Sequence, residues 1–346
     1  MTVEADASEL MSRVGHYYRV DAPYVVGREK VREYARAVQD AHPVHWAEHA
    51  AAEHGYDGLV APLTFVSIPA MAANRKLFED VVVGYDMFVQ TEQVFEQHRP
   101  IVVGDRLITD VELSAVRRIA GKDLITVTNT FTDEAGEVVH VMHTTVVGVT
   151  GDDVDPAITG AVDNVMVHDL KLLGRHRTAE AAADGEVPVR PEGELRLSLR
   201  GAERVPHTAV SFDDLTVGDE LPVRDAGVAR GDLVNYAGVS GDSNPIHWDD
   251  SIARLAGLPD VIAHGMLTMG LGVGFVSAWS GDPGAVTRYR VRLSNYAVVP
   301  REGGRIEYSG RVKSLDPDNR TAVVAIVAKQ AGRKIFGLAT ADLRFR

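Results

Sequence analysis

A carboxylate, a carboxamide and an imidazole lie within six residues of one another in the C-terminal half of the sequence. They belong to Asp242, Asn244 and His247, in the segment GDSNPIH, whose Gly, Ser, Asn and Pro residues favour a turn. The flanking apolar segments can hold such a loop in place, and functional side chains often lie on loops supported by a rigid scaffold. The pattern therefore predicts an acid/base site.

The chemistry that suits this set is proton transfer beside a thioester carbonyl. Elimination of water from such a substrate needs a group that takes the C2 proton, a group that protonates the departing hydroxyl and a donor for the developing enolate oxygen. Asp242 and His247 can fill the first two roles in either order. The third role suits a backbone N–H at a helix start, and Gly265 opens an apolar, helix-like segment.

The composition excludes several other chemistries. The chain of 346 residues has no cysteine, so it holds no disulfide framework, no Cys-type zinc site and no thiol nucleophile. Its formal net charge of −13 makes nucleic acid a poor partner. Residues 1–20 lack the apolar core of a signal peptide, and we expect a cytoplasmic protein.

One segment has nearly the length and composition of a membrane span. Residues 261–281 contain no Asp, Glu, Lys or Arg, but they include a histidine, several hydroxyl side chains and glycines, and no basic cluster flanks them. A helix that is apolar all round can also be enclosed by its own protein. We expect a buried core helix and no membrane insertion.

The chain contains an internal repeat. Residues 34–46 (YARAVQDAHPVHW) align without a gap on residues 236–248 (YAGVSGDSNPIHW), at a constant offset of 202 positions. The same offset places Gly55 on Gly257. Such a persistent register indicates the tandem duplication of one domain.

Each repeated block is followed by a helix-like apolar segment and then by stretches in which apolar and polar residues alternate, as in half-buried strands. The expected strands are residues 107–116, 124–132, 138–149, 287–293, 305–312, 322–328 and 335–345. This order suggests an α+β protein in which each antiparallel sheet wraps around a central helix.

The region between the halves is rich in proline and in Ala, Asp, Glu and Gly, with little periodicity. We therefore expect an N-terminal domain over residues 1–150, a linker over 151–208 with a short helix near 165–173, and a C-terminal domain over 209–346.

The string YAGVSGDSNPIH at residues 236–247, with AHGM at 263–266, closely resembles the signature of R-specific enoyl-thioester hydratases and MaoC-like dehydratases, which have the hot-dog fold. The resemblance implies that the matching Asp and His are catalytic, that the matching Asn orients the site and that the matching Gly amide forms the oxyanion hole. These residues are Asp242, His247, Asn244 and Gly265. Gly241 and His264, inside the same motif, are expected to contact substrate, and His264 is expected to be structural rather than a proton carrier. Some family members carry a Ser eight residues after the oxyanion Gly, where this chain has Val273.

The first half resembles the substrate-binding partner subunit of actinobacterial two-subunit (3R)-hydroxyacyl-ACP dehydratases, through VGREKVREYARAVQDAHPVHW and GYDGLVAPLTF. The whole chain then looks like a natural fusion of both subunits. The resemblance implies a double hot-dog fold and an intramolecular pseudo-dimer, and leaves open whether that unit pairs again as a homodimer.

The first copy keeps Asp40 and His45, which form a candidate second site, but it departs from the motif. Gln39 stands at the position of Gly241, His42 at that of Asn244, and Pro62-Leu63 at those of His264-Gly265. Pro62 has no N–H. We expect this copy to hold an acyl chain rather than to react with it.

Three further patterns do not call for a metal or a nucleotide. HWAEH at residues 45–49 matches a zinc-protease pattern, but the repeat explains His45 without a metal. The glycines at 270, 272 and 274 do not follow a strand of a βαβ unit and are expected to serve close helix packing. Pro69 falls inside the first copy's helical segment, where it should break or displace the helix and leave room for an acyl chain. We expect neither a metal nor a cofactor.

Basic residues are concentrated near position 290 in this acidic chain. Arg288, Arg290 and Arg292 share one face of a predicted strand, because side chains alternate along a strand. This face is either a solvated surface or a dock for an acidic carrier protein or the phosphates of CoA.

The sequence as a whole predicts reversible dehydration of (3R)-hydroxyacyl thioesters to trans-2-enoyl thioesters, carried on acyl carrier protein (ACP) in fatty-acid elongation. The alternatives are a CoA-linked (R)-specific hydratase of acyl or sterol side-chain metabolism, and an acyl-thioester binding module without catalysis. A hot-dog thioesterase is a weaker alternative, since the motif supplies no evident site for hydrolytic attack.

Overall fold

The computed structural model describes residues 7–85, 87–149 and 203–346, with short pieces between 150 and 202, mainly 189–191 and 195–199. The elements of the N-terminal half are α1 (Ala7–Ser12), β1 (Tyr17–Arg19), β2 (Tyr24–Val25), α2 (Arg28–Ala37), η1 (Pro43–His45), α3 (Glu48–Glu53), η2 (Leu63–Val66), α4 (Ser67–Lys76), η3 (Leu77–Val81), β3 (Met87–Gln97), β4 (Arg106–Ile119), β5 (Lys122–Thr132) and β6 (Glu137–Val149).

The short strand β7 (Arg196–Leu197) precedes the C-terminal half. The elements of that half are η5 (Phe212–Asp214), β8 (Glu220–Val228), α8 (Arg230–Ser240), η6 (Pro245–His247), α9 (Asp250–Leu255), α10 (Gly265–Ser280), η7 (Pro283–Ala285), β9 (Val286–Leu293), β10 (Gly304–Asp316), β11 (Thr321–Gln330), β12 (Arg333–Lys334) and β13 (Phe336–Arg344).

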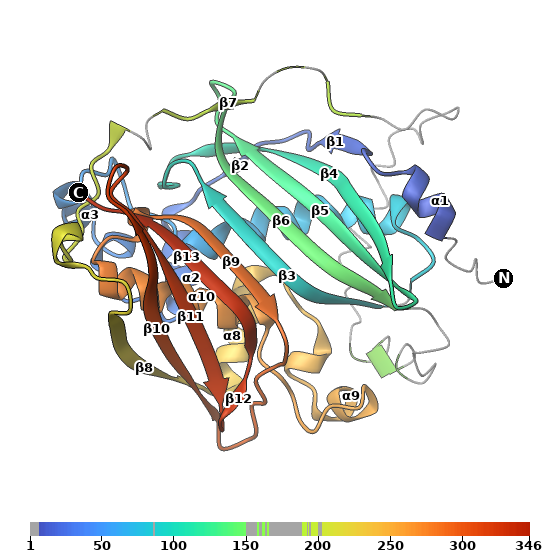
Figure 1. Ribbon diagram of the computed structural model, residues 1–346. Helices are drawn as coiled ribbons and strands as arrows, with labels where there is room; N and C mark the ends of the chain where they lie inside the picture. The colour runs from blue at the N-terminus through green and yellow to red at the C-terminus, as the bar shows by residue number, and fades with distance from the viewer. Residues whose placement is uncertain are drawn as a thin grey trace.

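The helices of the two halves recur at the offset of 202 positions. α2 corresponds to α8, η1 to η6, α3 to α9, and η2 together with α4 to α10. Each half is an antiparallel sheet wrapped around a central helical segment, so the predicted α+β double hot-dog fold is confirmed (Figure 1). The domain limits remain predictions, because most of the expected linker, including nearly all of the helix expected near 165–173, lies outside the described residues.

The two half-sheets join edge to edge. Strand order is β1-β4-β5-β6-β3-β9-β13-β11-β10-β8, and β3 pairs antiparallel with β9, so one sheet runs through both domains (Figure 1). All seven strands expected from sequence are present as β4, β5, β6, β9, β10, β11 and β13. The sequence analysis missed β3 and β8, and β3 is the strand that forms the junction.

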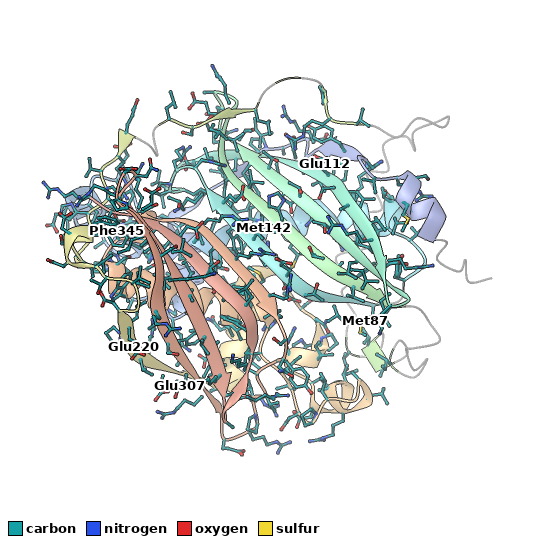
Figure 2. All side chains as sticks on the ribbon, in the orientation of Figure 1. Met87, Glu112, Met142, Glu220, Glu307 and Phe345 are labelled. Atoms are coloured by element: carbon teal, nitrogen blue, oxygen red, sulfur yellow. The ribbon has the colours of Figure 1, made fainter. Side chains whose placement is uncertain are left out.

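Helix α10 is buried along most of its length and contributes many residues to the hydrophobic core of the protein. Figure 2 shows the side chains on both domains in the orientation of Figure 1. The glycines of α10 permit close approach. A methyl group on Gly270 would lie 2.6 Å from Val38, and one on Gly272 would lie 2.7 Å from the Tyr289 hydroxyl. The predicted packing role of these glycines is therefore confirmed. No helix in the described ranges is both long enough and apolar enough to cross a membrane.

The segment of the N-terminal domain that corresponds to α10 is not one continuous α-helix, as expected from the presence of Pro69. It begins as the 3-10 helix η2, continues as α4 and ends as the π-helix η3. Pro69 lies in the first turn of α4, where a missing N–H costs no helical hydrogen bond.

A buried carboxylate ties the two halves together beyond the end of α10. Asp282 is 0% exposed and accepts hydrogen bonds from the Tyr56 hydroxyl, Arg204 Nη2 at 2.7 Å, the His207 N–H at 2.7 Å and the Gly284 N–H at 2.9 Å. Because these donors come from both halves and from the segment between them, Asp282 stabilises the relative placement of the domains.

Replacement of Asp282 by Asn should lower the free energy of unfolding by about 3 kcal/mol, because it leaves the Arg204 guanidinium, whose side chain is only 13% exposed, without its charged partner. Urea denaturation followed by circular dichroism measures this change. The matched control is Asp213→Asn, which removes an exposed ion pair to Arg320 and should shift the midpoint much less. Equal shifts for both variants would contradict the structural role of Asp282.

Candidate active site

The loop that carries the candidate acid/base residues is fixed by its own turn chemistry. Helix α8 ends at Gly241, whose φ of 83° is the left-handed conformation that favours glycine. The Asn244 side chain then accepts the N–H of Ile246 at 3.2 Å and caps η6. Trp248 Nε1 donates to the carbonyl of Ser243 at 3.0 Å. These contacts place Asp242 before η6 and His247 at its end.

His247 is held in one tautomer. Its Nδ1 lies 2.7 Å from the carbonyl oxygen of Ile262, which can only accept, so Nδ1 carries the proton. Nε2 is therefore left with a lone pair. Burial lowers the pKa of His247, although Asp242 and the Ile262 carbonyl act in the opposite direction. A neutral imidazole with a free Nε2 is suited to accept a proton.

His264 connects the loop to the helix that follows. Its Nε2 donates to the carbonyl oxygen of Asp242 at 3.2 Å, and its ring stacks on that of His247 with centroids 3.8 Å apart. Burial, together with the neighbouring His247, lowers the pKa of His264 to about 3. A ring that stays neutral and is bonded to the main chain agrees with the structural role expected for His264.

The N-terminus of α10 opens at the predicted Gly265. His264 occupies the N-cap position and makes no side-chain hydrogen bond to the first amides of the helix. Helical geometry gives these amides no partner within the helix, and the helix dipole favours negative charge there. The first turn of α10 can thus donate to an oxyanion, and the buried Val273 of the same helix adds no side-chain hydrogen bond.

Sequence reasoning missed a residue from the other domain. A methyl group on Gly265 would lie 3.2 Å from Gln90 Oε1 and 3.1 Å from Leu293 Cδ1, so β3 and the end of β9 border the α10 N-terminus. Gln90 lies 175 positions before Gly265, in a strand that the sequence did not predict, and it belongs to no recognisable motif. No local signal could have identified it.

The N-terminal copy brings the same two side chains together in a closed setting. His45 Nε2 lies 3.3 Å from Asp40 Oδ2, and the two residues are 0% and 6% exposed. A methyl group on Gly274 of α10 would lie 3.3 Å from Asp40 Oδ2, so the second domain's helix covers this carboxylate. Burial raises the pKa of Asp40, but the charge and hydrogen bond of His45 and the His42 N–H outweigh it and lower the pKa.

The substitutions in the first copy keep its backbone shape. Gln39 has a φ of 53°, in the left-handed region that Gly241 occupies in the second copy. His42 Nδ1 accepts the N–H of Val44 at 3.4 Å, as Asn244 caps η6, while His42 Nε2 donates to the carbonyl of Gly281. The loop is thus retained while its polar groups are used for packing against α10.

The three arginines of β9 have partners that the sequence did not reveal. Arg288 pairs with Glu96 of β3 at 3.2 Å, and Arg292 with Glu92 at 3.5 Å. Arg290 also pairs with Glu92. These ion pairs cross the junction between the domains and offset the positive charge. A role in carrier docking remains a prediction, and replacement of these arginines should also weaken the junction.

Asp242, His247 and His264 bring one ligand-type atom each within 4.8 Å of one another, the one such group found in the described part of the chain. The two imidazole planes are inclined by only 27°. A metal bound to an imidazole nitrogen lies in the ring plane at about 2.1 Å, and planes so nearly parallel do not meet within that distance. The arrangement fits acid/base chemistry better than metal binding. The side chains of the HxxEH pattern in the first copy bind separate partners: Glu48 pairs with Arg28, and His45 bonds to the Val60 carbonyl.

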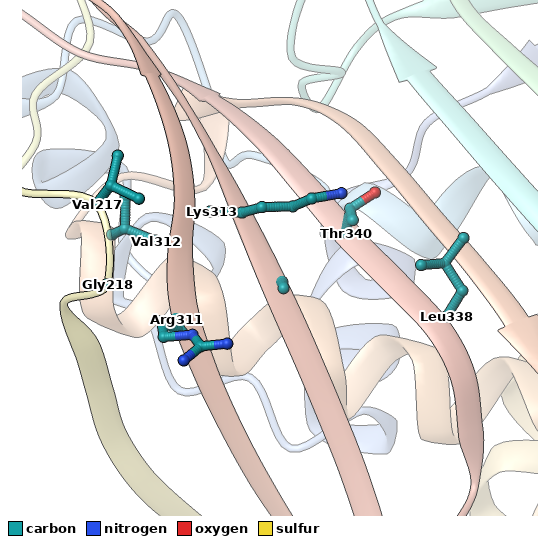
Figure 3. Close-up of a pocket in the computed structure, with 8 residues that line it drawn as sticks. Val217, Gly218, Arg311, Val312, Lys313, Leu338 and Thr340 are labelled. Carbon is teal, nitrogen blue, oxygen red and sulfur yellow. The ribbon is translucent and has the colours of Figure 1, made fainter.

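A separate depression of about 390 Å³ lies on the outer face of the C-terminal sheet, away from these loops (Figure 3). Its lining includes Arg311, Lys313, Leu338 and Thr340. These side chains lie on the face of the sheet opposite to α10, so the depression is not part of the candidate acid/base site.

Two family models match the chain. One, described as a FAS1-like dehydratase domain region, matches residues 12–142, and the other, a MaoC-like domain, matches residues 211–314. A solved structure described as a MaoC-like dehydratase is 63% identical, with a TM-score of 0.91, and the match covers 97% of this chain and 100% of that one. The chain belongs to the MaoC-like dehydratase family.

This MaoC-like dehydratase is also similar to other proteins. A UPF0336 protein of Mycobacterium leprae is 40% identical over 141 residues, which make up 40% of this chain and 85% of that protein. A Mycobacterium tuberculosis protein described as having a double hotdog fold is 16% identical, with a TM-score of 0.60 and 96% of each chain covered, and this likeness shows the fold. Family membership supports a dehydratase or hydratase role in general.

The pKa of His247 in this MaoC-like dehydratase should lie below the ordinary histidine value of about 6.5. Burial disfavours the charged imidazolium, so the ring should stay neutral until the pH falls below that value. An NMR titration, with the resonance assigned through His247→Gln, measures the midpoint. Asp242→Asn should lower the midpoint further, because the carboxylate favours the imidazolium. A midpoint above 6.5, or an upward shift in the Asp242 variant, would contradict this electrostatic description.

Proposed function

We propose that the protein catalyses reversible dehydration of (3R)-hydroxyacyl thioesters to trans-2-enoyl thioesters at the C-terminal site. The observation that carries the proposal is a neutral His247 with an unshared Nε2, beside Asp242 and beside the uncapped first turn of α10. The three functions that the elimination requires are thus represented within one small region.

In the proposed dehydration, Nε2 of His247 removes the C2 proton and the electron pair moves to the thioester oxygen. N–H groups of the first turn of α10 stabilise the enolate, which collapses and expels the C3 hydroxyl. The hydroxyl leaves as water with a proton delivered by the Asp242–His247 pair. In the reverse direction the same pair takes a proton from water and returns one to C2, so the balance of protons is restored.

The proposed carrier is ACP, on the strength of the sequence resemblance to two-subunit (3R)-hydroxyacyl-ACP dehydratases. The experiment that tests both the reaction and the carrier compares kcat/KM for matched acyl-ACP and acyl-CoA substrates over several chain lengths. Activity on both with a preference for ACP is expected. A preference for CoA would support the CoA-linked hydratase instead, and binding without turnover would support a non-catalytic module.

Asp242→Asn and His247→Ala should each lower kcat for enoyl-thioester hydration by about two to four orders of magnitude, as expected for loss of general acid/base catalysis. Steady-state assays with crotonyl thioester measure the loss. Asp249→Asn is the matched control, because Asp249 accepts the N–H groups of Ser251 and Ile252 at the start of α9. Near-normal rates in both site variants would remove these residues from the mechanism.

The two copies should contribute unequally. Asp40→Asn and His45→Ala should change kcat by less than about tenfold in protein that remains folded, because both side chains are buried and α10 covers the carboxylate. Active-site titration beside the turnover assay gives the number of working sites. Loss of half the turnover in Asp40→Asn and of the other half in Asp242→Asn would show two active sites and refute the asymmetry.

A further inference from the structure

Gln90 reaches from the N-terminal domain to the first turn of α10 in the C-terminal domain. Its Oε1 would lie 3.2 Å from a methyl group on Gly265, and its Nε2 lies 3.8 Å from the Met266 sulfur. Strand β3 has a bulge between Gln90 and Glu92, which changes the direction of the side chains at this point. A residue of one domain thus borders the candidate oxyanion site of the other.

A fixed neighbour determines which end of the Gln90 amide faces the site. Gln93, only 1% exposed, donates through Nε2 to the His143 carbonyl at 3.0 Å, so its Oε1 must point the other way. That Oε1 accepts the Thr144 hydroxyl at 2.9 Å and the Gln90 Nε2 at 2.8 Å. With its nitrogen bonded to Gln93, Gln90 presents its carbonyl oxygen toward the start of α10.

A carbonyl oxygen can only accept a hydrogen bond, and this limits its partner. The thioester oxygen is an acceptor as well and is suited to the N–H groups of the helix, so a substrate group that bonds to Gln90 Oε1 must be an N–H or an O–H. Thioesters of both ACP and CoA carry such a group close to the reacting centre, since an amide N–H follows the sulfur after two methylene groups. A site that bonds an N–H favours a substrate that has this group over an analogue that lacks it.

We propose that Gln90 is a specificity-determining residue that accepts a hydrogen bond from the cysteamine amide N–H of the thioester substrate. Gln93 is the positioning residue that holds the Gln90 carbonyl in the required orientation. The inference rests on the proposed function, because it concerns the same site and substrate class.

The test compares hydration of two small crotonyl thioesters, one of N-acetylcysteamine and one of 2-acetoxyethanethiol, which differ only in NH against O. The native protein should prefer the amide by about three- to tenfold in kcat/KM, the effect of one neutral hydrogen bond. Gln90→Met, of similar length and without an acceptor carbonyl, should abolish the preference. Gln93→Met should reduce the preference for the amide, because it removes the group that orients the Gln90 carbonyl. Gln90→Asn should also reduce this preference, because the shorter side chain withdraws the carbonyl by about one bond length.

Val89→Ala is the matched control, since Val89 is the adjacent residue of β3 and is 47% exposed. It should keep the preference for the amide. Hydration of neither thioester by the native protein would refute the proposed function itself. Equal rates on both thioesters, or a preference that survives in folded Gln90→Met, would refute the role of Gln90 while leaving the proposed function intact. An equal loss on both thioesters in Gln90→Met would indicate that the oxygen contacts the water that adds to C3 instead, and would also overturn the proposal.

Discussion

Helix α10 is apolar on every side, and the arrangement of both domains follows from the need to cover it. The hydroxyl groups of Tyr289 and Tyr308, from the sheet of its own domain, donate to the carbonyls of Met269 and Thr268. The opposite side is covered by the N-terminal domain, where Val38 lies so close that only a glycine fits at position 270. A second domain is thus a physical requirement of this helix. The end of the helix at Gly265 remains available for a polar ligand.

The same helix explains why two copies of one motif have different environments. Near its middle, Gly274 packs on Asp40 and closes the N-terminal pair, while at its beginning the uncapped amides lie next to the C-terminal loop. Duplication retained the loop geometry in both halves, including a left-handed residue at Gln39 and at Gly241. The two Asp–His pairs therefore differ in environment because a different part of α10 packs against each loop, and not because the loops differ in backbone shape.

The sequence predicted the parts of the structure that local chemistry determines. The repeat register, the turn after Gly241, the start of α10 and seven strands all depend on residues that are near one another in the chain. Strand β3 could not be recognised, because Gln93, Val94 and Phe95 are buried in succession at the domain junction and a bulge interrupts the alternation. The partners of the β9 arginines and the approach of Gln90 to Gly265 depend on pairing across about 200 positions of sequence. The identity of the acyl carrier is a property of the substrate that no local pattern specifies.

The surroundings of the two homologous imidazoles show why the second copy is the one open to a substrate. His45 and His247 make the same main-chain hydrogen bond, from Nδ1 to the carbonyls of Val60 and Ile262, so this bond does not distinguish the copies. In the first copy the carboxylate and the imidazole are 6% and 0% exposed, their facing atoms lie 3.3 Å apart, and α10 packs over the carboxylate at Gly274. Asp242, by contrast, is only half-buried and lies beside the beginning of α10 rather than under its middle. Burial under α10, rather than the bonding of the imidazole, is therefore the difference that leaves an acid/base pair accessible in the C-terminal domain.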